Sequence, residues 1–247
     1  MASDVARSGR SARLTDLHER FIVEQREMAP SARRQLYTIA AALVVVGVVG
    51  FTISLGAVVG TGGPTALDVA MREWLMAGRS EDWTPGMVAV SFIFGPIFFP
   101  FFALAITVAW VLLARHLWRP ILLAVGTGVA VAGVRLMAIA VGRDRPPAAD
   151  MLNEVDTSES FPSGHVVGAS TFILLIAYLV FSRRQARRIA AISFVIAGLA
   201  IVVTSLSRMY LGYHWATDVL GSVFLALVVL GAVVAVDTWR TTVPRGG

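Results

Sequence analysis

The chain has 247 residues, of which 56% are hydrophobic, and its mean hydropathy of +0.73 excludes an ordinary soluble domain. It contains no cysteine, which excludes disulfides and thiolate metal sites. The formal net charge is +5, and all 21 basic residues are arginine, because the chain has no lysine. These values indicate a polytopic membrane protein, since there are enough apolar residues for several spans.

Residues 1–34 form an arginine-rich segment in which Leu14, Leu17, Phe21 and Met28 share one helical face. We expect either an amphipathic helix that lies on the membrane surface and ends at Pro30, or a mobile basic tail.

A membrane domain at residues 35–238 and a tail at residues 239–247 are predicted to follow this segment. Apolar runs near the length of a bilayer core predict six transmembrane helices, at residues 36–59, 87–113, 121–141, 166–181, 189–206 and 216–236. Pro96 and Pro100 are expected to bend the second of them.

The arginines gather at alternate ends of these spans, and this distribution argues against nucleic acid as a partner. Seven lie in residues 1–34, two follow the second span, four follow the fourth, and Arg240 and Arg245 close the chain. The positive-inside rule then predicts a multi-pass protein of the cell membrane with both termini in the cytoplasm. The remaining three loops face outward.

The outward loop before the sixth span reads "SRMYLGYHWATD" at residues 207–218. His214 and Asp218 are four residues apart, so on a helix the carboxylate can accept the proton of one imidazole nitrogen. The other nitrogen is then free to act as a nucleophile. Arg208 adds a bidentate donor suited to phosphate.

A second outward segment, "SFPSGH" at residues 160–165, opens the fourth span. With Pro162 in the first helical turn, the amides of Ser163, Gly164 and His165 are expected to be unsatisfied donors that bind an anion. His165 can also donate a proton near neutral pH. Arg145, in "GRDRPP" at residues 142–147, can complete a cationic pocket, and the whole set fits phosphoryl transfer through a phosphohistidine.

These segments resemble the three signature motifs of the type 2 phosphatidic acid phosphatase (PAP2) family: Arg145-Pro146, residues 162–165 ("PSGH"), and Ser207-Arg208 followed by His214 and Asp218. The resemblance covers about residues 36–236. It implies an all-α fold with six transmembrane helices in a PAP2-like bundle. It also implies a lipid phosphate or diphosphate phosphatase that acts on the outer leaflet and needs no metal or other cofactor.

The resemblance also implies a role for each matched residue. His214 would be the nucleophile that forms a phosphoenzyme, Asp218 would orient it, and His165 would protonate the departing lipid oxygen and then activate water. The phosphoryl oxygens would be bound by Arg145, Arg208, Ser163 and Gly164.

One position departs from the family pattern, because Ala138 stands where the first motif has a lysine. Arg143, two residues before Arg145, is a candidate replacement as a phosphate ligand. Arg135, one helical turn before Ala138 and inside an apolar span, is the other candidate. The acidic residues of the same loop are expected to form a solvated surface rather than a metal site: Asp144, Asp150, Glu154, Asp156 and Glu159.

The resemblance leaves the lipid open, and undecaprenyl or another polyprenyl diphosphate, phosphatidate and phosphatidylglycerol phosphate are all candidates. Arginine-only, alanine- and valine-rich usage indicates a high-GC bacterium and favours polyprenyl diphosphate. A phosphotransferase and a catalytically silent lipid-binding relative are the alternatives from other functional classes. The partners expected from the residues are therefore the bilayer and a phosphorylated lipid, and the oligomeric state is open.

Overall fold

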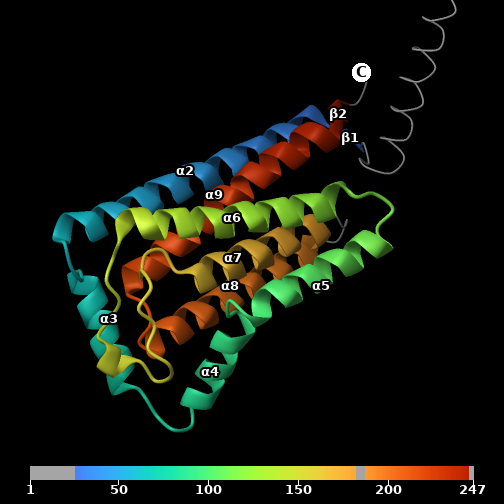
Figure 1. The fold of residues 1–247 in the computed structure, drawn as a ribbon. Helices are drawn as coiled ribbons and strands as arrows, with labels where there is room; N and C mark the ends of the chain where they lie inside the picture. Colours follow the sequence, from blue (N-terminus) through green and yellow to red (C-terminus); the bar gives the residue numbers. More distant parts are fainter. Residues whose placement is uncertain (1–25, 182–186, 245–247) are drawn as a thin grey trace, which may run out of the picture.

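Helices make up most of the chain, because a backbone that crosses a bilayer must satisfy its hydrogen bonds within each segment. The computed structural model describes residues 26–181 and 187–244 (Figure 1). Its elements in chain order are β1 (Arg26–Met28), α2 (Pro30–Thr61), α3 (Ala66–Ala77), α4 (Thr84–Ile93), α5 (Phe98–Leu113), α6 (Trp118–Val141), η1 (Ala148–Asp150), α7 (Gly164–Ile176), η2 (Ala177–Phe181), α8 (Arg187–Tyr210), α9 (Ala216–Thr241) and β2 (Thr242–Pro244).

In the described residues, five spans are long and apolar enough to cross a membrane, and the pair α4 and α5 makes a sixth if it is counted as one broken span. This agrees with the predicted all-α, six-span fold class. The axes of α4 and α5 differ by 52°. The break contains Gly95 and Pro96, and a proline that lacks the amide hydrogen cannot continue the hydrogen-bond ladder. Pro100 lies in the first turn of α5, where a proline is tolerated.

Helix α3 was not predicted from the sequence. Thr65 caps it, since its side chain accepts from the Asp68 amide at 3.2 Å while the Asp68 carboxylate accepts from the Thr65 amide at 2.9 Å. Its twelve residues are too few to span a bilayer, and the helix lies across one end of the bundle (Figure 1).

The start of the chain differs from the expected surface helix. Arg26–Met28 form strand β1, which pairs in parallel with β2 at the other end of the chain. Pro30 is the first residue of α2 rather than the end of a helix, because a proline at that position loses no hydrogen bond. The rest of the expected surface helix lies outside the described residues.

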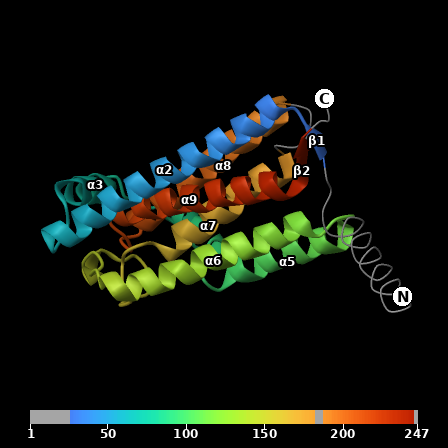
Figure 2. The ribbon, with the colours of Figure 1, turned by 90° about the horizontal axis from the view of Figure 1, so that it is seen from above.

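Helix α7 and its continuation η2 occupy the centre of the bundle, since 67% of residues Gly164–Phe181 are buried, and α7 is in contact with α6, α8 and α9. Helix α2 lies along α9, as the view from above also shows (Figure 2). The two backbones approach closely at Gly231, where a Cβ would lie 2.7 Å from the carbonyl oxygen of Ala40.

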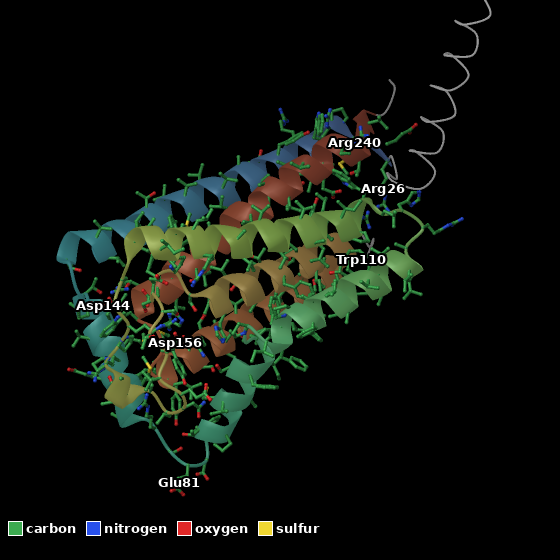
Figure 3. All side chains as sticks on the ribbon, in the orientation of Figure 1. Arg26, Glu81, Trp110, Asp144, Asp156 and Arg240 are labelled. Carbon is green, nitrogen blue, oxygen red and sulfur yellow. The ribbon has the colours of Figure 1, made fainter. Side chains whose placement is uncertain are left out.

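The two ends of the bundle carry different parts of the chain. Arg26, Trp110 and Arg240 lie at the end that holds β1 and β2, whereas Asp144 and Asp156 lie at the opposite end, beside α3 (Figure 3). Helices α3 and α4 and the three motif segments therefore meet at one end of the bundle.

Candidate active site

His214 lies in the short turn between α8 and α9, two residues before α9 begins. The turn needs a glycine, because Gly212 has a φ of 82° and a Cβ there would clash with the Asp150 carbonyl group. The Tyr213 amide closes the turn by donating to the Arg208 carbonyl oxygen at 3.0 Å. The conformation of this turn thus fixes the position of the His214 backbone, from which the imidazole extends.

The imidazole of His214 is held from both sides. Its Nδ1 lies 2.9 Å from the carbonyl oxygen of Ser160 and 3.5 Å from Oδ2 of Asp218. Its Nε2 lies 3.2 Å from Nη1 of Arg145. Since an arginine can only donate, Nε2 is the acceptor and the proton of the neutral ring is on Nδ1. The lone pair of Nε2 therefore faces a cation, which suits attack on a bound anion.

Burial lowers the pKa of His214 to about 4. The hydrogen bond to Asp218 opposes this shift, and the charges of Arg145 and Arg208 add to it. The imidazole is accordingly neutral at physiological pH, which is the form that a nucleophile requires.

Asp218 is fully buried in the first turn of α9, and each of its oxygens is satisfied. Its Oδ2 accepts from the Ser160 hydroxyl at 2.5 Å and from the Trp215 amide at 2.8 Å. Its Oδ1 accepts from Nη1 of Arg143 at 2.5 Å. The carboxylate beside His214 is thus fixed by three donors in addition to the imidazole.

Arg145 bridges the motif loop and the nucleophile. Besides its contact with His214, it donates to the carbonyl oxygens of Tyr213 at 2.7 Å and Ser158 at 2.8 Å, and it pairs with Asp156 at 2.9 Å. Burial lowers the pKa of Arg145, and the neighbouring carboxylates oppose this shift, Asp156 most strongly. Asp156 keeps 36% of its side chain exposed, in line with the expected solvated loop, and is also bound by this cation.

Arg208, near the end of α8, is buried against α4 and the turn that carries His214. Its Nη1 donates to the Ser91 hydroxyl of α4 at 2.5 Å, and its guanidinium lies 4.2 Å from the ring centre of Tyr213. Its Nε has no hydrogen-bond partner among the described residues. A buried donor without an acceptor is costly, so the Nε–H group of Arg208 is suited to donate a hydrogen bond to a bound anion.

The start of α7 differs from the expected arrangement. Pro162 precedes the cap instead of lying in the first turn, and Ser163 is the N-cap, whose hydroxyl accepts from the Val166 amide at 3.5 Å. The Ser163 amide is not free, because it donates to the Ser222 hydroxyl at 2.8 Å. In the described chain, the amides of Gly164 and His165 have no such partner. The anion-binding capacity of this helix end therefore rests on these two amides.

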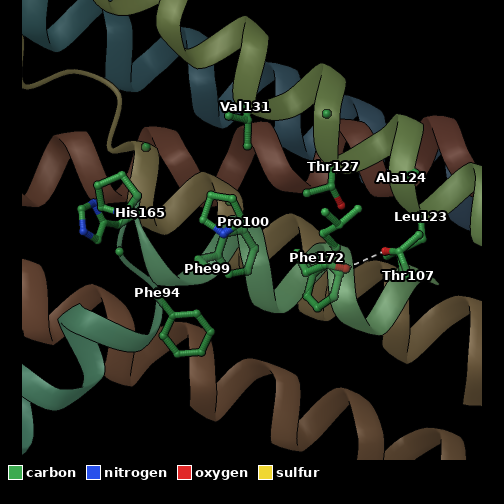
Figure 4. Close-up of a pocket in the computed structure, with 17 residues that line it drawn as sticks. Phe94, Phe99, Pro100, Thr107, Leu123, Ala124, Thr127, Val131, His165 and Phe172 are labelled. Atoms are coloured by element: carbon green, nitrogen blue, oxygen red, sulfur yellow. Dashed lines mark hydrogen bonds between the residues drawn. The ribbon is translucent and has the colours of Figure 1, made fainter. Parts of the chain in front are cut away.

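His165 is the point where the three motifs meet an apolar cavity. It lies within electrostatic range of Arg208, His214 and Arg145. It also lies at one end of a cavity of about 470 Å³ between α5, α6 and α7, whose lining includes Phe99 and many other apolar residues (Figure 4). A charged headgroup at the arginines could therefore extend an apolar tail past His165 into the cavity.

The two candidates to replace the missing lysine lie elsewhere. Arg143 lies behind Asp218, and its guanidinium is occupied by Asp218, Asp68 and Thr217. Its predicted role as a phosphate ligand is therefore not supported by the geometry. Arg135 is 69% exposed, and its nearest ionic partner is Glu159, at 3.8 Å.

Several neighbours of the site were missed in the sequence. Ser160 stood inside a motif segment, but nothing in its spacing indicated a contact with His214. Ser91 and Asp68 belong to helices that are far from the motifs along the sequence. The one signal at Asp68 was a capping pattern. Asp150, expected on a solvated surface, is buried and paired with Arg72. Among the described residues, no group of three histidine or acidic side chains could hold a metal ion.

A model of the PAP2 superfamily matches residues 119–242, which contain all three motif segments. The solved structure titled "Crystal structure of the first transmembrane PAP2 type phosphatidylglycerolphosphate phosphatase from Bacillus subtilis" superposes with a TM-score of 0.67. It is 25% identical, and the match covers 76% of this chain and 92% of that one.

Two curated relatives share the name phosphatidylglycerophosphatase B. The protein of Bacillus subtilis (strain 168) is 36% identical over 102 residues, which are 39% of this chain and 47% of the relative. The protein of Escherichia coli (strain K12) is 34% identical over 84 residues, which are 34% of this chain and 30% of the relative. The alignments thus span less than half the length of these relatives.

Proposed function

We propose that this chain, which belongs to the PAP2 superfamily, is a membrane phosphatase that removes phosphate from a lipid through a phosphohistidine at position 214. The observation that carries the proposal is the state of the His214 ring. Ser160 and Asp218 hold its Nδ1 side, and its unprotonated Nε2 faces Arg145. An oriented nucleophile beside a guanidinium is what attack on a phosphoryl group requires.

In the proposed first step, the Nε2 lone pair of His214 forms a bond to phosphorus while the bond from phosphorus to the lipid oxygen breaks. His165 gives its proton to that oxygen, which leaves as an alcohol, or as a phosphate when the substrate is a diphosphate. The proton on Nδ1 stays in place, so the phosphorylated ring is cationic and is stabilised by Asp218.

In the second step, His165 takes a proton from a water molecule, whose oxygen attacks phosphorus. The bond to Nε2 breaks, inorganic phosphate leaves, and neutral His214 is restored. Arg145 and Arg208 would bind the non-bridging oxygens throughout, together with the amides of Gly164 and His165.

A lipid substrate is supported by the cavity that begins at His165. Its apolar lining suits an acyl or prenyl chain, and it adjoins the end of the bundle where the arginines gather. The names of the curated relatives make phosphatidylglycerol phosphate the first lipid to test. The polyprenyl diphosphate favoured by the sequence stays a prediction, and the cavity suits its tail equally.

The test is phosphate release by the purified full chain from phosphatidylglycerol phosphate, phosphatidate and undecaprenyl diphosphate, with His214→Ala as the inactive reference. We expect release without any added acceptor, loss in the variant and no effect of EDTA. Release that depends on a second acceptor would instead identify a phosphotransferase. Equal activity of the variant, or no activity on any of the three lipids, would overturn the proposed mechanism.

A further inference from the structure

Asp68, near the start of α3, is fully buried, and its carboxylate contacts two other segments of the chain. Its Oδ1 accepts from the Thr217 amide at 2.8 Å and the Thr217 hydroxyl at 2.9 Å. Its Oδ2 accepts from Nη2 of Arg143 at 2.7 Å and from the Thr65 amide at 2.9 Å. Asp68 thus joins α3 to the first turn of α9 and to the motif loop.

Arg143 connects Asp68 to the nucleophile. One end of its guanidinium pairs with Asp68, and the other, Nη1, donates to Oδ1 of Asp218 at 2.5 Å. Asp218 then presents Oδ2 to Nδ1 of His214. The described side chains therefore form a continuous row: Asp68, Arg143, Asp218, His214.

The charges along this row decide what Asp68 does. If Asp68 were absent, the buried Arg143 cation would have Asp218 as its one carboxylate partner and would neutralise it. With Asp68 present, two carboxylates share one guanidinium, and the row keeps a net charge of minus one. Burial alone would raise the pKa of Asp68, but the amides of Thr217 and Thr65 and the Arg143 guanidinium outweigh it, so the pKa is lowered and the residue is ionised.

We infer that Asp68 is a positioning residue for the nucleophile. Asp68 acts through Arg143 to keep the Asp218 carboxylate charged and aimed at His214. This inference rests on the proposed function. It gives α3, which lies outside the residues matched by the family model, an indirect part in the reaction through Arg143 and Asp218. It also gives Arg143 a role in place of phosphate binding.

The test compares Asp68→Asn with Glu73→Gln, which removes the same charge from an exposed position of the same helix. A single turnover with a ³²P-labelled lipid phosphate yields two numbers for each variant. The amplitude of phosphohistidine formation reports how much protein is folded and competent. The rate constant reports how well each competent molecule attacks phosphorus, so it is independent of partial unfolding.

We expect Asp68→Asn to lower this rate constant about 10- to 100-fold, the size of loss known for residues that orient the histidine ligands of metal sites, with KM unchanged because the phosphate ligands are intact. Glu73→Gln should match the wild type. In Asp68→Asn/Arg143→Gln both charges are removed, and the loss should be smaller than the product of the two single losses.

A reduced amplitude with a normal rate constant would overturn the inference, since it would identify a purely structural role. A parallel rise in KM, or losses that multiply in the double variant, would do the same. These outcomes are separable from failure of the proposed function, because in that case the wild type itself would form no phosphohistidine.

Discussion

Replacing Asp218 by asparagine should slow phosphorylation of His214 about a hundredfold, without abolishing it. Where a carboxylate is the sole partner of a catalytic histidine, the same change costs about 10⁴-fold, because the ring adopts the wrong tautomer. Here the Ser160 carbonyl oxygen lies closer to Nδ1, at 2.9 Å, than Asp218 does, at 3.5 Å. The Nδ1–H tautomer should therefore survive the substitution. What is lost is the electrostatic stabilisation of the His214 ring by the Asp218 charge.

The size of that part follows from the geometry. Two unit charges about 4 Å apart interact by about 4 kcal/mol at an effective dielectric constant of about 20, which sets an upper limit near 10³-fold. Arg143 shares the Asp218 charge at 2.5 Å, so the field at the His214 ring is weaker than this limit. A loss of about a hundredfold corresponds to about 2.7 kcal/mol.

The assay is the single-turnover rate constant for phosphohistidine formation, with Asp82→Asn as a control that makes the same substitution at an exposed position. A loss as complete as that of His214→Ala would refute the reasoning, because it would mean that Ser160 does not hold the tautomer. A loss below about threefold would also refute the reasoning, since it would mean that the Asp218 charge does not stabilise the His214 ring.

Three further predictions concern the same site. Because burial lowers the pKa of His214 to about 4, its Nε2 stays unprotonated above that value, so phosphorylation by p-nitrophenyl phosphate should show its acidic limb near pH 4; a limb near 6.5 would contradict the buried, neutral ring. Gly128→Phe, which places a ring in the cavity lining, should raise KM for a long-chain lipid phosphate at least tenfold, with KM for p-nitrophenyl phosphate unchanged. Gly133→Phe is the matched control, since it lies on the same helix outside the lining and its Cβ likewise meets no atom within 4 Å. Equal effects of the two variants would exclude the cavity as the tail site. Ser91→Ala removes a hydrogen bond to the charged Arg208, worth about 1.5–3 kcal/mol, and should raise KM about tenfold in steady-state phosphate release; an unchanged KM would show that Arg208 does not bind the substrate.

The sequence predicted the parts of the site whose spacing has a physical meaning. The four-residue spacing of His214 and Asp218 predicted that they pair on one helix face. They do pair, but His214 lies in the turn before α9, so the turn rather than a helix brings the imidazole to Asp218. The alternation of arginine-rich and motif-bearing span ends predicted that three distant segments share one end of the bundle, as they do in Figure 3. The number of spans followed from the length of each apolar run.

The rest could not be predicted, because it depends on contacts between residues distant in sequence. The Thr217 amide and Asp68 are 149 residues apart, and Arg143 and Asp218 are 75 apart, so no periodicity connects them. The break between α4 and α5 illustrates a smaller failure. Two prolines marked a bend, but their spacing could not decide which of them interrupts the helix.

The first half of the chain supports the chemistry of the second half, and this division bears on how the enzyme could vary. Every residue proposed to touch the phosphoryl group lies within residues 119–242, which match the family model. Two residues of this range are fixed from outside it: Arg208, which is proposed to bind the phosphoryl group, by Ser91 of α4, and Asp218, which orients His214, by Asp68 of α3 through Arg143. Changes in α3 and α4 can therefore alter the rate and the fit of the substrate while every motif residue stays the same. The identity of the three motifs alone is then insufficient to predict activity in a relative, since the rate also depends on whether its first helices supply an equivalent carboxylate and hydroxyl.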